Sequence, residues 1–135
     1  MIEEYETEDV IKALEDKAWN NGITILDVYD LDPTTSDTVI VEAESIFMNY
    51  NSTKVSYAFR LAHELSHLLY GDTSSQAVYH FSEFGKRGEE LLAHKNAIKM
   101  LIEIKRPTSV QTFMKVYNVP SWLLEYVEAE YSLQV

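Results

Sequence analysis

Hydrophobic positions recur with a helical period in four stretches of the chain and with a strand-like pattern in three shorter ones. The predicted helices are residues 3–20, 52–70, 88–104 and 108–117, and a last helix is expected after them, capped by Ser121. The predicted strands lie between the first two helices, at residues 22–29, 38–42 and 45–49. A chain of 135 residues with this order of elements predicts one α+β domain, residues 1–135, with a short sheet packed on a central helix and additional helices at the C-terminal end.

Residues 73–86, between the second and third predicted helices, are polar and aromatic and indicate no particular structure. The helix expected at residues 108–117 should begin at a capping box, in which Thr108 and Gln111 satisfy each other's backbone N–H groups.

The stretch 52–70 is apolar around most of its circumference, which is typical of a central, buried helix. Its polar residues nevertheless fall on a single stripe, formed by Ser56, Arg60, His63, Glu64 and His67. Unpaired charge in a protein core costs several kcal/mol, so the stripe must have partners. We expect Arg60 to neutralise an acidic neighbour rather than to bind a substrate.

The stripe contains His63-Glu64-Leu65-Ser66-His67, an H-E-x-x-H motif on a helix. Residues four apart on a helix lie on one face, with Cβ atoms about 5–6 Å apart, so both imidazoles can bind one metal ion. Zinc takes imidazole nitrogen in tetrahedral sites. Glu64 is offset from the two histidines, where it can take a proton from water as a general base. The alternative is a chance pair of histidines, but the buried helix and its single polar stripe favour the metal site.

A catalytic zinc site needs a third protein ligand, and the chain has no cysteine. One face of the stretch 88–104 carries a carboxylate, an imidazole and small residues, namely Glu90, Ala93, His94 and Ala97. The alanines would let this helix approach another closely and bring Glu90 or His94 to the metal. We favour Glu90, which offsets the charge of Zn²⁺, and we place His94 in a supporting position or simply packed. Glu89 is expected to be an ordinary solvated charge.

Tyr79 and His80 lie in the irregular segment before Glu90. A hydroxyl or imidazole there could donate a hydrogen bond to the tetrahedral transition state of peptide hydrolysis. The simpler interpretation, which we favour, is that one or both merely pack.

Together these motifs resemble the ImmA/IrrE-type metallopeptidases of phages and mobile elements. The resemblance covers most of the chain and is carried by Ile46–Asn49, Leu61–His67 and Glu90–His94, followed by Ala97-Ile98 and Leu101-Ile102. The chain departs from the family at His94, where Asn or Asp is usual, and at Ser66, where Gly is frequent.

The resemblance implies a zincin-like fold and a zinc-dependent endopeptidase. Carried over by position, it implies the zinc ligands His63, His67 and Glu90, with Glu64 as the general base. It also implies the substrate, a helix-turn-helix repressor encoded nearby by the same mobile element.

The charge of the chain limits its partners. With 22 acidic and 11 basic residues, its net charge is −11, which disfavours nucleic acid and anionic membranes and suits a basic protein. The acidic N-terminal residues do not look like a signal peptide, and no apolar run approaches the roughly 18–20 residues of a membrane span. We therefore expect a cytoplasmic protein.

Residues 107–135 have the outline of a helix-turn-helix, but the second helix would carry only acidic charges, from Glu125, Glu128 and Glu130. A DNA-reading helix carries Lys or Arg. This pair of helices is therefore expected to pack on the domain or to bind a protein.

Two other functions remain open at this stage. A protein that keeps the fold of a metallopeptidase but has no protease activity could regulate a repressor by binding it. An acidic mimic of DNA would also bind such a repressor, and its binding would fall steeply with salt and ignore metal chelators.

Overall fold

The computed structural model describes residues 2–71, 78–83 and 88–133. The elements in these ranges are α1 (Ile2–Asn20), β1 (Thr24–Val28), β2 (Thr38–Ile40), β3 (Ser45–Asn49), α2 (Tyr57–Tyr70), β4 (Val78–His80), α3 (Gly88–Ile104), α4 (Val110–Val116), the 3-10 helix η1 (Ser121–Leu123) and α5 (Leu124–Ser132). The fold is thus α+β, as predicted.

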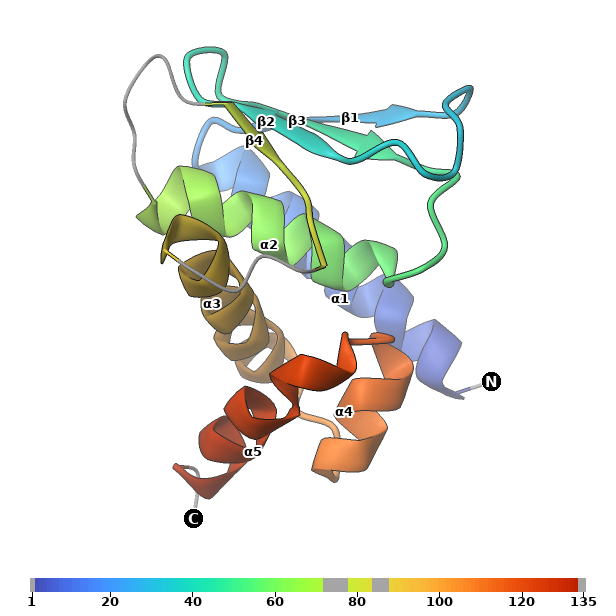
Figure 1. Cartoon of the computed structure of the whole chain (residues 1–135), viewed down its shortest axis with the longest axis vertical. Coiled ribbons are helices and arrows are strands. Elements are labelled where there is room, and N and C mark those ends of the chain that lie inside the picture. The colour runs from blue at the N-terminus through green and yellow to red at the C-terminus, as the bar shows by residue number, and fades with distance from the viewer. Residues whose placement is uncertain (1, 72–77, 84–87, 134–135) are drawn as a thin grey trace.

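The four strands form a small mixed sheet in the order β1-β3-β2-β4. β1 and β3 are parallel, while β2 is antiparallel to both β3 and β4. Figure 1 shows α2 lying between this sheet and the C-terminal helices. Helix α2 is buried from Ala58 to His67, which matches the central helix expected from its sequence.

The predicted start of α2 at residue 52 is wrong, because the helix begins at Tyr57. Ser56 caps it, accepting a hydrogen bond from the backbone N–H of Phe59 at 3.1 Å. The carbonyls of Ser52 and Val55, which a longer helix would have used internally, accept hydrogen bonds from the guanidinium of Arg60 instead.

Two predicted caps near the C-terminus are also wrong. Ser109, not Thr108, caps α4 by accepting from the N–H of Thr112 at 3.1 Å. Ser121 opens the 3-10 turn η1 rather than an α-helix, and α5 follows from Leu124 without a side-chain cap. The two C-terminal helices are joined to the core by buried apolar residues, namely Phe113, Leu123 and Val127.

β4 lies in the segment for which the sequence indicated no structure. Tyr79 is paired with Val39 of β2, and beyond the strand the N–H of Phe81 donates to the carbonyl of Asp37 at 2.9 Å. The flanking residues 73–77 and 84–86 of that segment lie outside the described ranges. β4 therefore extends the sheet at its edge next to β2, close to the buried face of α2.

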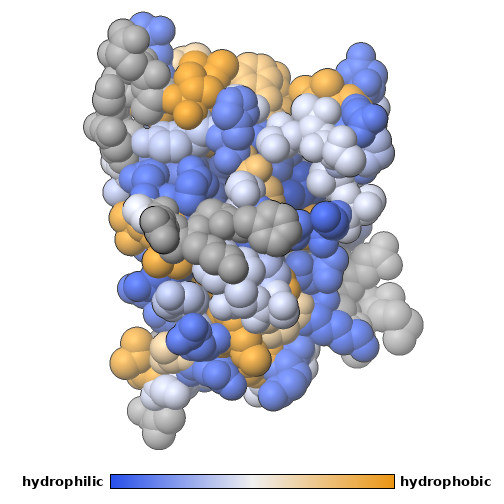
Figure 2. All heavy atoms as spheres, viewed as in Figure 1, coloured by the Kyte–Doolittle hydropathy of each residue, from blue (hydrophilic) through white to orange (hydrophobic). Residues whose placement is uncertain are grey.

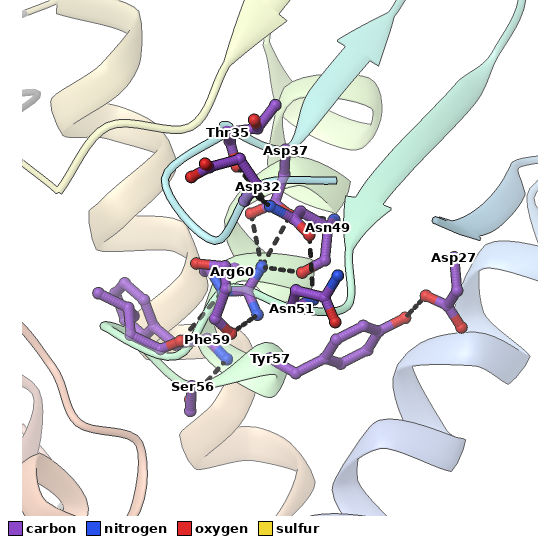
Figure 3. A network of polar contacts seen from close by, with 12 residues as sticks. Asp27, Asp32, Thr35, Asp37, Asn49, Asn51, Ser56, Tyr57, Phe59 and Arg60 are labelled. Atoms are coloured by element: carbon purple, nitrogen blue, oxygen red, sulfur yellow. Dashed lines mark hydrogen bonds and ion pairs between the residues drawn. The ribbon is translucent and has the colours of Figure 1, made fainter. Parts of the chain in front are cut away.

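A buried ion pair fixes α2 to the sheet (Figure 3). Arg60 Nη1 lies 2.7 and 2.9 Å from the two carboxylate oxygens of Asp37, and the side chains are only 2% and 1% exposed. Asp37 also accepts from the backbone N–H of Asn49 at the end of β3. Arg60 thus neutralises an acidic neighbour, as expected, and the pair joins α2 to both β2 and β3.

Removing one partner of this ion pair should destabilise the fold strongly. We expect Asp37→Ala to lower the free energy of unfolding by about 3–5 kcal/mol, because the Arg60 cation would remain buried without its counter-ion. Urea unfolding would measure this, with the exposed Asp30→Ala as the control expected within about 0.5 kcal/mol of the wild type. Equal stability of the two variants would contradict this role.

The surface is mixed in character. Figure 2 shows hydrophilic residues over much of the viewed face, with hydrophobic residues in separate patches. Within the described ranges, every helix is too short or too polar to cross a membrane.

Candidate metal centre

The candidate site forms where α3 packs against α2. Ala93 and Ala97 are fully buried on the contacting face of α3 and let the two helices approach closely, as the sequence suggested. The first turns of α3 thereby bring carboxylates and an imidazole to the histidines of α2.

His63, His67 and Glu90 converge. One potential ligand atom from each residue lies within 4.8 Å of the others. His63 Nε2 is 3.0 Å from Glu90 Oε1, and His67 Nε2 is 3.4 Å from Glu90 Oε2. Each oxygen of one carboxylate therefore faces one imidazole nitrogen, and this group could hold a metal ion.

The protonation of His63 is set by His94. His94 Nε2 lies 3.0 Å from the carbonyl oxygen of Ser82, which can only accept, so Nε2 must donate. Burial, with the nearby His63, lowers the pKa of His94 to about 3, so the ring is neutral and its Nδ1 holds a lone pair. That atom lies 3.1 Å from His63 Nδ1, which must therefore donate its proton to it. His63 Nε2 is left with a lone pair directed at Glu90.

His67 is held in the same way by a different partner. Its Nδ1 lies 2.9 Å from Glu89 Oε2, so Nδ1–H donates to the carboxylate. Its Nε2 is buried, and no residue in the described ranges forms a hydrogen bond with it. The expectation that Glu89 is an ordinary solvated charge is therefore wrong. Glu89 lies in the first turn of α3, above the C-terminal end of α2, and its side chain is only 26% exposed.

With these protonation states, neither His63 Nε2 nor His67 Nε2 carries a proton to donate to Glu90. A metal ion bound to both nitrogens and to the carboxylate would take the place of these missing protons. Burial lowers the pKa of His63, so its ring carries one proton, and both His94 and Glu90 face it as acceptors. The Glu90 carboxylate thus faces two imidazole lone pairs, which a shared cation would attract.

Two histidines and a glutamate are a ligand set that zinc uses in catalytic sites. Ligand atoms about 2.0–2.2 Å from one ion in tetrahedral geometry are about 3.3 Å from each other. Here the two imidazole nitrogens lie 3.0 and 3.4 Å from different oxygens of Glu90, and one ligand atom from each of the three residues lies within 4.8 Å of the others. The donor types therefore fit zinc.

Glu64 lies beside this group. Among the described residues, neither of its buried carboxylate oxygens has a hydrogen-bond partner, and Oε1 is 3.9 Å from His67 Nε2. Burial raises the pKa of Glu64 well above its ordinary value, the charges of Asp37 and Glu90 raise it further, and only Arg60 acts in the opposite direction. A divalent cation held nearby would also favour the ionised form.

Aromatic rings cover the histidines. The Tyr79 ring stacks on His67 at 3.9 Å, nearly parallel, and Phe81 meets His63 edge-on at 5.0 Å. Trp122 contacts His94 edge-on at 5.5 Å. His80 points to the opposite face of β4 and bonds Thr38 on the exposed side, so it does not join the cluster. Phe81 and Trp122 could not be predicted as part of the site from the sequence, because their contacts depend on the packing of distant segments.

An open cleft borders the site. Its volume is about 450 Å³, and its lining includes Lys54, Asp37 and Arg60 together with Phe81 and Ser82. Phe81 therefore separates the cleft from His63.

Comparison of the chain with protein-family models, curated proteins and solved structures finds no match. What the protein does must therefore be argued from the site itself.

Proposed function

We propose that this chain is a zinc-dependent endopeptidase with a zincin-like fold, of the ImmA/IrrE type. The observation that carries the proposal is the convergence of His63 Nε2, His67 Nε2 and the Glu90 carboxylate beside Glu64, whose carboxylate has no hydrogen-bond partner within the described part of the chain. A buried carboxylate without a partner is costly in a purely structural core, whereas hydrolysis of a peptide requires a base at this place.

Each residue of the site would have its own role in peptide hydrolysis. The chemistry that zinc supplies when bound is polarisation of a carbonyl and a lowered pKa for water. His63, His67 and Glu90 would hold the ion, with the histidines presenting Nε2. Glu64 would take a proton from the attacking water on a carboxylate oxygen and deliver it to the nitrogen of the leaving amine.

The acidic surface supports a basic protein substrate. A net charge of −11 attracts a positively charged partner and speeds its association. A helix-turn-helix repressor encoded nearby, which the family resemblance implies, is such a protein. We place the activity in the cytoplasm, where such a repressor acts.

One observation favours a second function. His63, Glu64 and His67 are completely buried, so a peptide backbone cannot reach them unless covering residues move. A module that binds the repressor and never cuts it would need no such movement. The open cleft beside Phe81 would serve as a binding surface in either case.

Incubation of the zinc-loaded protein with the neighbouring repressor separates these functions. Fragments on a gel that disappear when a chelator is added support the peptidase. A stable complex without fragments, under the same conditions, supports the binding module and contradicts the peptidase. Binding that is lost steeply with salt, unaffected by chelator and by changes at His63, would indicate an acidic mimic of DNA instead.

A further inference from the structure

The end of α2 and the start of α3 meet around one glycine. Gly71 ends α2, and its N–H donates to the carbonyl of His67 at 3.2 Å. A Cβ atom added at Gly71 would lie 1.9 Å from Glu89 Oε2 and 2.8 Å from the carbonyl oxygen of His67. The Glu89 carboxylate therefore occupies the space that any other residue at position 71 would fill.

The backbone at Gly71 does not itself require glycine. Its φ of −92° and ψ of −165° are open to any residue. The glycine is needed for close approach, and two groups approach it: the carboxylate bonded to His67 and the carbonyl oxygen of His67 itself.

We infer that Glu89 is the positioning residue of His67, and that Gly71 makes room for it. This inference rests on the proposed metal site. A carboxylate that accepts Nδ1–H of a ligand histidine orients the ring, fixes the proton on Nδ1 and makes Nε2 more basic. His63 has a neutral partner, His94, in the corresponding place. Glu89 is thus the charged one of the two supporting residues.

Zinc affinity tests this role directly. We expect Glu89→Ala to weaken zinc binding about 10–100-fold, as is typical when a partner of a ligand histidine is removed. Glu89→Gln keeps an oxygen that accepts from Nδ1–H and should lose less. Glu103→Ala removes an exposed carboxylate from the same helix and should bind like the wild type. Equal affinity of Glu89→Ala and the wild type would overturn the inference.

The protonation of His67 supplies a measurement that needs no metal. In the metal-free protein, two-bond ¹H–¹⁵N correlations should show His67 protonated on Nδ1 in the wild type and in Glu89→Gln. In Glu89→Ala the proton should redistribute between the two nitrogens, while His63 keeps its state as an internal reference. An unchanged His67 pattern in Glu89→Ala would contradict the role of Glu89.

Gly71→Ala tests the steric part. The added methyl group would displace the Glu89 carboxylate and would also press on the carbonyl of His67, so this variant should lose at least as much zinc affinity as Glu89→Ala. The double variant should lose no more than Gly71→Ala alone, because the Glu89 interaction is already lost there. Additive losses would overturn the role of Gly71.

These outcomes separate two failures. If the wild type does not bind zinc, the proposed function fails, and the metal-free spectra still test the hydrogen bond. If the wild type binds zinc through His63, His67 and Glu90 but Glu89→Ala changes nothing, only the present inference fails.

Discussion

Glu64→Gln should abolish peptide cleavage while leaving the fold and the zinc content intact. General acid–base catalysis contributes typically about 10²–10⁴-fold, and the amide cannot take the proton from water, so the loss should be at least of this size. The fold should tolerate the change, because burial already raises the pKa of Glu64 and favours its neutral form in the metal-free protein. Fragment formation from the repressor, zinc content and urea unfolding would each be measured.

The exposed Glu103→Gln on α3 is the matched control and should cleave like the wild type. Cleavage by Glu64→Gln at the wild-type rate would show that Glu64 is not the base. Loss of zinc or of folded protein together with activity would also contradict the proposed role, since a base is not required for either.

The second large effect concerns the third ligand. His94→Ala should weaken zinc binding about 10–100-fold. Glu90→Ala should weaken it by more than that. Glu90 directs one oxygen at each histidine Nε2, at 3.0 and 3.4 Å, whereas both ring nitrogens of His94 are engaged by His63 and the carbonyl of Ser82. His94 would therefore act only through His63.

Zinc titration of both variants, against a competing chelator, would measure this difference. The metal-free stability of each should be measured alongside, because His94 is fully buried and its removal leaves a cavity. If His94→Ala lost zinc and Glu90→Ala kept it, the ligand assignment would be wrong.

The central part of the candidate site could be predicted from the sequence because it depends on helix geometry alone. His63 and His67 lie one turn apart on any helix, whatever surrounds it. Glu90 could be proposed because Ala93 and Ala97 indicated which face of α3 contacts a neighbour.

The rest depends on how distant segments pack. β4 has three residues, too few for an alternating pattern, and it exists only because it pairs with β2. The contact of Glu89 with His67 cannot be predicted from a helical wheel, which assumes that the neighbouring helix lies alongside, whereas α3 begins over the end of α2. A glycine that ends one helix and a pair of glutamates that begins the next are the only sequence signals of that contact.

The most direct test of the metal centre is a crystal structure of the zinc-loaded protein with anomalous data collected at the zinc edge. A single anomalous peak bonded to His63 Nε2, His67 Nε2 and a carboxylate oxygen of Glu90 is the predicted result. In that structure, His94 and Glu89 would lie on the far sides of the His63 and His67 rings, as their hydrogen-bond partners. A peak bonded to His94, or the absence of any peak between α2 and α3, would contradict the proposed centre.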